Sequence, residues 1–197
     1  MNRYARIFVA AAMALLSLAL VGTGPVAAAS MAQLRAEALS IHQMPTGWTA
    51  RQPTEDLRMG CLTHLLEPKG VKETHFEEVY FLAKGDLPLL VETLTTYSSA
   101  TAAYKKIAAS IARCKKVSGV LKGYPVTGTV RPLRVPHYGN ASVEYLITLS
   151  GKHVTVKSDY AIVRKGAVIM ALLEANYPAV SPSQFRSFLI KAVARVK

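Results

Sequence analysis

The residues of this sequence that are best able to do chemistry favour binding and structure over catalysis. There is no G-x-S-x-G motif, so the nucleophile turn of a common α/β hydrolase is missing. The adjacent Glu77 and Glu78 would point to opposite faces of a strand and cannot by themselves form a glycosidase pair. The histidines never lie two to four residues apart, which excludes H-E-x-x-H and a local zinc pair; they are His42, His64, His75, His137 and His153. We expect no enzymatic activity, no metal and no cofactor.

Candidate binding residues lie in the segment Tyr124–Asn140, which contains three prolines. Prolines limit the freedom of a loop, and guanidinium and imidazole groups recognise anionic or sugar-bearing ligands. The candidate ligand-binding residues are Arg131, Arg134, His137 and Tyr138. An ordinary rigid connection is the alternative. Trp48, the only tryptophan, is expected to anchor the N-terminal segment in the core, with a cap over an apolar cleft as the alternative.

The N-terminus has the composition of a secretory signal peptide. Two arginines in residues 2–6 precede a fifteen-residue run, Ile7–Val21, that is apolar except for one serine, and small residues fill Gly22–Ser30. Such a pattern predicts cleavage after Ala29. An uncleaved anchor is the alternative, although the run is shorter than the ~20 residues that a spanning helix needs. No cysteine lies near this site, so we expect a secreted, extracellular protein without a lipid anchor.

Residues 30–197 then form the mature chain, which is long enough for a single domain with its own core. No later apolar run approaches ~20 residues, so we expect no transmembrane segment after cleavage. The only two cysteines, Cys61 and Cys114, are an even count in an exported protein and predict a disulfide. Reactive thiols are the alternative, but no C-x-x-C motif is present.

Charge is divided unevenly along the chain. Residues 30–92 hold nine acids and six bases, whereas residues 93–197 hold sixteen bases and three acids, Glu144, Asp159 and Glu174. This asymmetry predicts an anionic partner, such as a lipid, an envelope polymer or an acidic protein. A charge that only maintains solubility is the alternative. Nucleic acid would fit the charge but not the export.

A candidate basic surface lies on the outer side of a helix predicted over Ser99–Val117, whose other side is apolar. It consists of Lys105, Lys106, Arg113 and Lys116. Four more bases would extend it if the two main helices pack on the same side of the sheet: Lys157, Arg164, Lys191 and Arg195.

Hydrophobic periodicity predicts an α+β domain. Alternating or β-branched segments predict strands over Thr74–Leu82, Leu89–Tyr97, Ser142–Leu149, Lys152–Arg164 and Ala167–Ala175. A short helix is expected over Met31–Ile41 and a longer one after Ser181 and Pro182. The prolines of Tyr124–Asn140 predict only a short or edge strand there, and Asp159 is expected to face outward. The predicted fold is an antiparallel sheet of about five to six strands with two main amphipathic helices packed on it and one disulfide.

Several motifs follow one another in order along residues 30–197. They are M-P-T-G-W at Met44–Trp48, Cys61, T-Y-S-S-A-T-A-A at Thr95–Ala102, Arg113–Cys114, D-Y-A-I-V-R-K-G-A-V at Asp159–Val168, and the closing helix. Together they resemble the PknH-like extracellular sensor-domain family of actinobacterial exported proteins. The resemblance implies an antiparallel sheet with packed helices, a ligand-binding cleft and no catalytic activity. That family commonly carries two disulfides, whereas this chain can form one. Actinobacterial lipoproteins with a Mog1/PsbP-like fold are similar too.

The sequence therefore predicts a non-catalytic, exported ligand-binding or sensor-like domain of an actinobacterial cell envelope. We expect a monomer whose partner is an unknown small ligand, a lipid or an anionic envelope polymer, with an envelope protein as a further candidate. Two other classes remain as alternatives: a hydrolase of envelope lipid or glycan, assembled from distant residues, and a structural protein that coats polyanions by charge alone.

Overall fold

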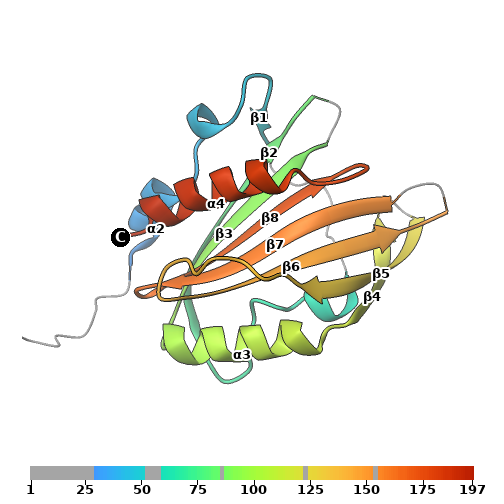
Figure 1. The fold of residues 1–197 in the computed structure, drawn as a ribbon. Coiled ribbons are helices and arrows are strands. Elements are labelled where there is room, and N and C mark those ends of the chain that lie inside the picture. The colour runs from blue at the N-terminus through green and yellow to red at the C-terminus, as the bar shows by residue number, and fades with distance from the viewer. Residues whose placement is uncertain (1–28, 52–58, 85–86, 122–123, 153–154) are drawn as a thin grey trace, which may run out of the picture.

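The fold consists of one antiparallel sheet with helices on both of its faces (Figure 1). A computed structural model describes residues 29–51, 59–84, 87–121, 124–152 and 155–197. The predicted signal peptide, apart from Ala29, lies outside the described residues, as does His153. The strand order is β1-β2-β3-β8-β7-β6-β5-β4. The predicted α+β class is therefore confirmed, but the predicted number of five to six strands is wrong, because the sheet has eight.

The described elements follow the predicted order, with additions at both edges of the sheet. The helices are α2 (Met31–Glu37), α3 (Ala100–Arg113) and α4 (Pro182–Arg195), with short 3-10 turns η2 (Ile41–Gln43) and η3 (Gly60–Leu62). The strands are β1 (Thr49–Ala50), β2 (Glu73–Leu82), β3 (Leu89–Tyr97), β4 (Lys116–Leu121), β5 (Tyr124–Pro132), β6 (Ala141–Ser150), β7 (Thr155–Lys165) and β8 (Val168–Asn176).

Two sequence expectations fail at the β4 edge. The predicted helix over Ser99–Val117 ends at Arg113, and the chain enters β4 at Lys116. The segment expected to hold only a short or edge strand instead forms the nine-residue β5, which has β4 on one side and β6 on the other. Its two prolines, Pro125 and Pro132, lie near the ends of the strand. At these positions the missing N–H interrupts the ladder least.

Serine side chains begin the two long helices as the sequence predicts. Ser99 Oγ accepts a hydrogen bond from the backbone N–H of Ala102, and Ser181 Oγ accepts one from Gln184. Each bond satisfies a backbone donor that has no partner within its helix. In α4 a proline follows the cap at the first helical position, where its fixed φ suits the helix.

The sheet is buried on both faces by helices that lie on opposite sides of it (Figure 1). On the face that we call the α4 face, Leu90, Met170 and Leu172 pack with Phe185 and Phe188. The opposite face, the α3 face, has its own apolar cluster, in which Ile107, Ile111, Tyr145, Ile147, Tyr160, Ile162 and Ile169 pack together. The central strand β8 is therefore covered from both sides, which accounts for its near-continuous apolar sequence.

Trp48 joins the N-terminal segment to the core. Its ring packs edge-to-face on Phe188 with centroids 5.6 Å apart, and it is a half-buried member of the α4-face cluster. The expectation that Trp48 anchors this segment is confirmed.

Candidate functional site

The predicted binding loop encloses a small hollow at the end of β5. The chain leaves β5 through a hydrogen bond from Leu133 N–H to the Glu144 carbonyl. The N–H of Tyr138 donates to Ser142 Oγ at 3.0 Å, while the Tyr138 ring packs against the α4-face cluster. The loop is closed by Asn140, whose N–H donates to the Arg164 carbonyl. These contacts hold the loop against β6 and leave a hollow of about 270 Å³.

The structure brings together two of the four candidate ligand-binding residues. Arg134 and His137 line the hollow, beside Ser142 and Glu144 of β6. Tyr138 supports the loop from the core instead. Arg131 is exposed on β5 and is not part of the lining.

The hollow suits an anionic group better than a whole drug-sized ligand. Arg134 and His137 are exposed, and their ring and guanidinium donors can bind a carboxylate or phosphate. A volume of about 270 Å³ is slightly below the usual range for small-molecule pockets. The site therefore provides positive charge and polar donors but encloses little of a ligand.

A cluster of four buried carboxylates, missed in the sequence, lies on the α4 face in two adjacent rows across the strands. Its members are Glu92 of β3, Glu174 of β8, Asp159 of β7 and Glu144 of β6. Asp159 lies directly opposite Glu174 in the ladder, and both are less than 5% exposed. Among the described residues, one oxygen of Glu92, one of Glu144 and both of Glu174 are buried without a hydrogen-bond partner. Glu92 and Glu144 lie in the row next to that of Asp159 and Glu174, so the cluster depends on the strand register and not on any local sequence pattern.

Burial raises the pKa of all four carboxyl groups in this cluster. It raises the pKa of Glu92 to about 7, while the Leu39 N–H that donates to Glu92 Oε2 at 2.6 Å acts in the opposite direction. Burial, and then the nearby Asp159, raise the pKa of Glu144 and of Glu174 to about 7. Burial also raises the pKa of Asp159 itself. Desolvation disfavours a carboxylate, so the three glutamates retain their protons well above the pH at which a free glutamate loses its own.

Asp159 was expected to face outward, and that expectation is wrong. The period-two pattern places Tyr160 and Ile162 on one side of β7 and Asp159 on the other. The expectation held only for a strand with helices packed on one of its two sides. Because α4 covers the other side, Asp159 is 4% exposed.

The same burial limits what the carboxylates can do chemically. Asp159 and Glu174 have the proximity of a catalytic pair, but a substrate cannot contact them in this structure because neither is accessible. Glu144 alone borders the hollow. The described residues contain no group of three or more His, Cys, Asp or Glu side chains able to hold a metal ion.

The candidate basic surface is divided between the two sides of the molecule. Lys105, Lys106 and Arg113 are exposed on α3. Lys116 lies on β4, opposite Thr129 of β5. The next residue, Val117, is buried in the α3-face cluster, and because side chains alternate along a strand, Lys116 points to the α4 face. The expectation that all four bases lie on one side of one helix is therefore wrong for Lys116.

The proposed extension of this surface along the closing helix is not continuous either. Lys191 and Arg195 belong to α4, on the face opposite α3. Both donate to backbone carbonyls near the N-terminus, Lys191 to Gln43 and Arg195 to Glu37. They join α4 to α2 and to the turn η2 that follows it.

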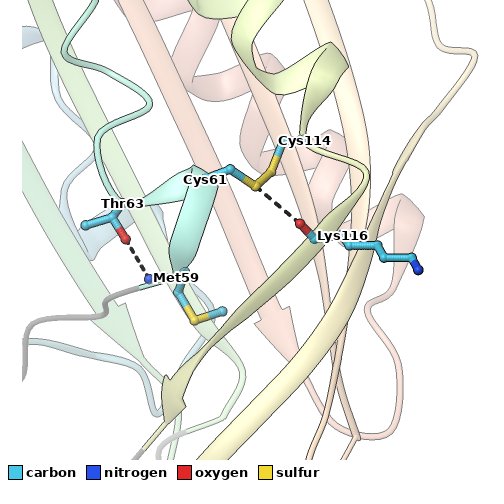
Figure 2. Close-up of a disulfide and its surroundings, with 5 residues drawn as sticks. All are labelled: Met59, Cys61, Thr63, Cys114 and Lys116. Carbon is cyan, nitrogen blue, oxygen red and sulfur yellow. Dashed lines mark hydrogen bonds between the residues drawn. A yellow bond between two sulfur atoms is a disulfide. The ribbon is translucent and has the colours of Figure 1, made fainter.

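The predicted disulfide between Cys61 and Cys114 is present, with Cα atoms 5.9 Å apart (Figure 2). It joins η3 to the end of α3. Cys61 Sγ also lies 3.4 Å from the Lys116 carbonyl oxygen, and Met59 N–H donates to Thr63 Oγ1 within the same turn. The bridge therefore fixes η3 beside the start of β4.

These features define an α+β domain with a disulfide, a single two-sided sheet and no described helix that is long and apolar enough to cross a membrane. A solved structure with this fold is the extracellular domain of PknH from Mycobacterium tuberculosis, with a TM-score of 0.62 and 13% sequence identity over 85% of this chain and 96% of that one. The predicted resemblance is therefore confirmed at the level of the fold.

A second similar structure is an uncharacterised protein, an Rv0999 ortholog, from Mycobacterium smegmatis. It has a TM-score of 0.47 and 14% identity over 85% of this chain and 95% of that one. No protein-family model matches the sequence, and no curated protein matches it significantly.

Proposed function

We propose that the protein is a non-catalytic, exported ligand-binding or sensor-like domain of the bacterial cell envelope that contacts an anionic envelope component. The class rests on the fold, which is shared over 85% of the chain with a domain that is extracellular in PknH. The disulfide supports export, because such bonds persist in oxidising compartments and Cys61 and Cys114 are bonded here.

One observation carries the chemistry of the partner. Residues 93–197 hold sixteen bases and three acids, and all three acids, Glu144, Asp159 and Glu174, are buried. The described surface of this half of the chain therefore presents basic side chains without an exposed acidic side chain. Such a surface attracts anions and repels cationic partners.

The loop hollow gives this attraction a specific location. Arg134 and His137 lie there on a loop held by β6, so a carboxylate or phosphate of the ligand would meet donors that are already in place. One exposed guanidinium and one exposed imidazole next to Ser142 favour recognition of an anionic headgroup or sugar acid.

A hydrolase receives less support. The carboxylates that come closest to a catalytic pair, Asp159 and Glu174, are 4% and 0% exposed. General acid and base groups must come within hydrogen-bond reach of the substrate.

Native mass spectrometry of the protein purified from its own envelope tests the proposal. We expect a retained anionic lipid or glycan, and we expect Arg134→Gln with His137→Gln to reduce its occupancy. Arg113→Gln is the control, because it removes one guanidinium from α3 and leaves the hollow unchanged. A protein that carries no ligand and binds no anionic lipid or polymer after purification would contradict the proposed function.

A further inference from the structure

The described residues leave one part of the sheet uncovered. On the α4 face, α4 and α2 pack over β2, β3, β8 and the part of β7 that contains Ala161 and Val163. Beyond β7, alternate residues of β5 are exposed on this face while their neighbours, such as Val126 and Val130, are buried toward α3. We call this uncovered area over β4, β5 and β6, with the adjoining edge of β7, the open face.

The strand register collects hydroxyl groups and bases on the open face. One row across the strands reads Lys116, Thr129, Thr148 and Lys157. In the next row Arg131 stands beside Leu146. With adjacent strands about 4.8 Å apart, the two lysines of the first row are separated by about 14 Å at the backbone. Three bases thus surround two threonines.

A shallow hollow of about 510 Å³ lies over these strands. Polar side chains of three strands line it: Lys116, Ser118, Thr127, Thr129, Thr148 and Ser150. Each hydroxyl can donate and accept a hydrogen bond. The described acids that border the open face, Glu144 and Asp159, are both 4% exposed, so neither carboxylate is placed to contact a bound ligand directly.

We propose that the open face binds an extended anionic polysaccharide, with Lys116, Arg131 and Lys157 contacting its acidic groups and Thr129 and Thr148 its hydroxyls. This inference rests on the proposed function and assigns the anionic partner a class and a second contact surface.

Three features favour a polysaccharide over other anions. The site is broad and shallow and extends over several strands, which suits a chain better than a small molecule. It is lined mainly by hydroxyl groups, whereas a membrane-binding surface needs apolar side chains to enter the bilayer. The described residues that line the hollow include no aromatic ring, and single-stranded nucleic acid is usually held by stacking on such rings.

Binding of short and long oligogalacturonates to the full mature chain tests the site, with malto-oligosaccharides as neutral controls. We expect the charged oligomers to bind, the longer more tightly, and the neutral ones not to bind. The triple variant Lys116→Gln, Arg131→Gln, Lys157→Gln should weaken binding by about tenfold or more. The matched control is Lys105→Gln, Lys106→Gln, Arg113→Gln, which removes the same charge from α3 and should leave binding within about twofold. Circular dichroism verifies that both variants fold.

A second pair of variants tests direct contact independently of charge. Thr129→Val and Thr148→Val keep the shape and the net charge, and we expect them to weaken binding by several-fold. Chemical-shift changes in the unmodified protein should also fall on β4, β5 and β6.

The possible failures are distinguishable. Equal loss in both triple variants would show that net charge alone drives binding, and loss only in the α3 variant would place the site there. Either result overturns the open face as the site and leaves the proposed function standing. Binding to anionic vesicles but not to the oligomers would replace the polysaccharide with lipid. An unmodified protein that binds neither would overturn the proposed function together with this site.

Discussion

Replacement of Glu174 by Gln should stabilise the protein at alkaline pH and have little effect at acidic pH. Glu174 is fully buried on β8 opposite Asp159, and neither of its carboxyl oxygens has a hydrogen-bond partner. Gln has nearly the same shape but carries no charge at any pH in the range. The substitution therefore removes the ionisation and leaves the packing almost unchanged.

The size of the effect follows from the pKa of Glu174 in the two states. Burial and then Asp159 raise the pKa from 4.5 in the unfolded chain to about 7 in the folded protein. Between these values the folded state binds more protons than the unfolded state, so the free energy of unfolding falls as pH rises. The contribution is fully present below pH 4.5 and lost once pH has passed about 7. For one such group the total loss is about 3 kcal/mol.

Urea unfolding at a series of pH values between about 4 and 9 measures this directly. The unmodified protein should lose stability across the window, while Glu174→Gln should equal it at the acid end and exceed it by about 3 kcal/mol at the alkaline end. Glu77→Gln is the control, because Glu77 pairs with Arg35, whose guanidinium stays charged throughout the series, and its difference from the unmodified protein should change little with pH. A Glu174→Gln variant that is destabilised equally at both ends would refute the reasoning.

Three further results are expected. Reduction of the Cys61–Cys114 bond, or its replacement by two alanines, should lower the free energy of unfolding by about 4 kcal/mol, measured by urea unfolding, since the bond closes a loop with a sequence separation of 53; an unchanged midpoint would contradict this. Gly128→Ala should destabilise by about 2 kcal/mol or more in the same assay, because the added Cβ would lie 2.0 Å from a backbone carbonyl oxygen of β6; normal stability would show that β5 moves easily. Phe188→Ala should cost about 3–5 kcal/mol and red-shift the emission of Trp48, whose ring it contacts; unaltered fluorescence would argue against that contact in solution.

Most of the fold could be predicted because local patterns and final packing agree. Ser99, Ser181 and Pro182 begin the long helices as predicted, and β3 has the predicted bounds. The disulfide followed from the even number of cysteines in a chain with a predicted export signal, and it is present. The helix starts and the strand depend on neighbouring residues, which a sequence displays.

The remainder depended on contacts between distant residues. Val117–Leu121 is too short to distinguish a strand from a helix end by periodicity, so β4 was missed, and Lys116 was placed on the wrong element. Nothing local indicates that α3 and α4 cover opposite faces. For that reason the burial of Asp159 and the cluster of carboxylates were not predicted. The open face could not be predicted either, because it depends on the register of four strands.

The strand order also determines when the complete sheet can form during synthesis. β8 is the last strand to be made, yet it lies in the interior of the sheet between β3 and β7, pairing Leu89 with Ala175. Until it emerges, the chain holds two separate half-sheets, each with an apolar edge that has no partner. Such edges are prone to intermolecular pairing, and long-range pairing of this kind is slow to form. A chain that stops before β8 is therefore expected to aggregate, even though it retains most of its strands and both cysteines.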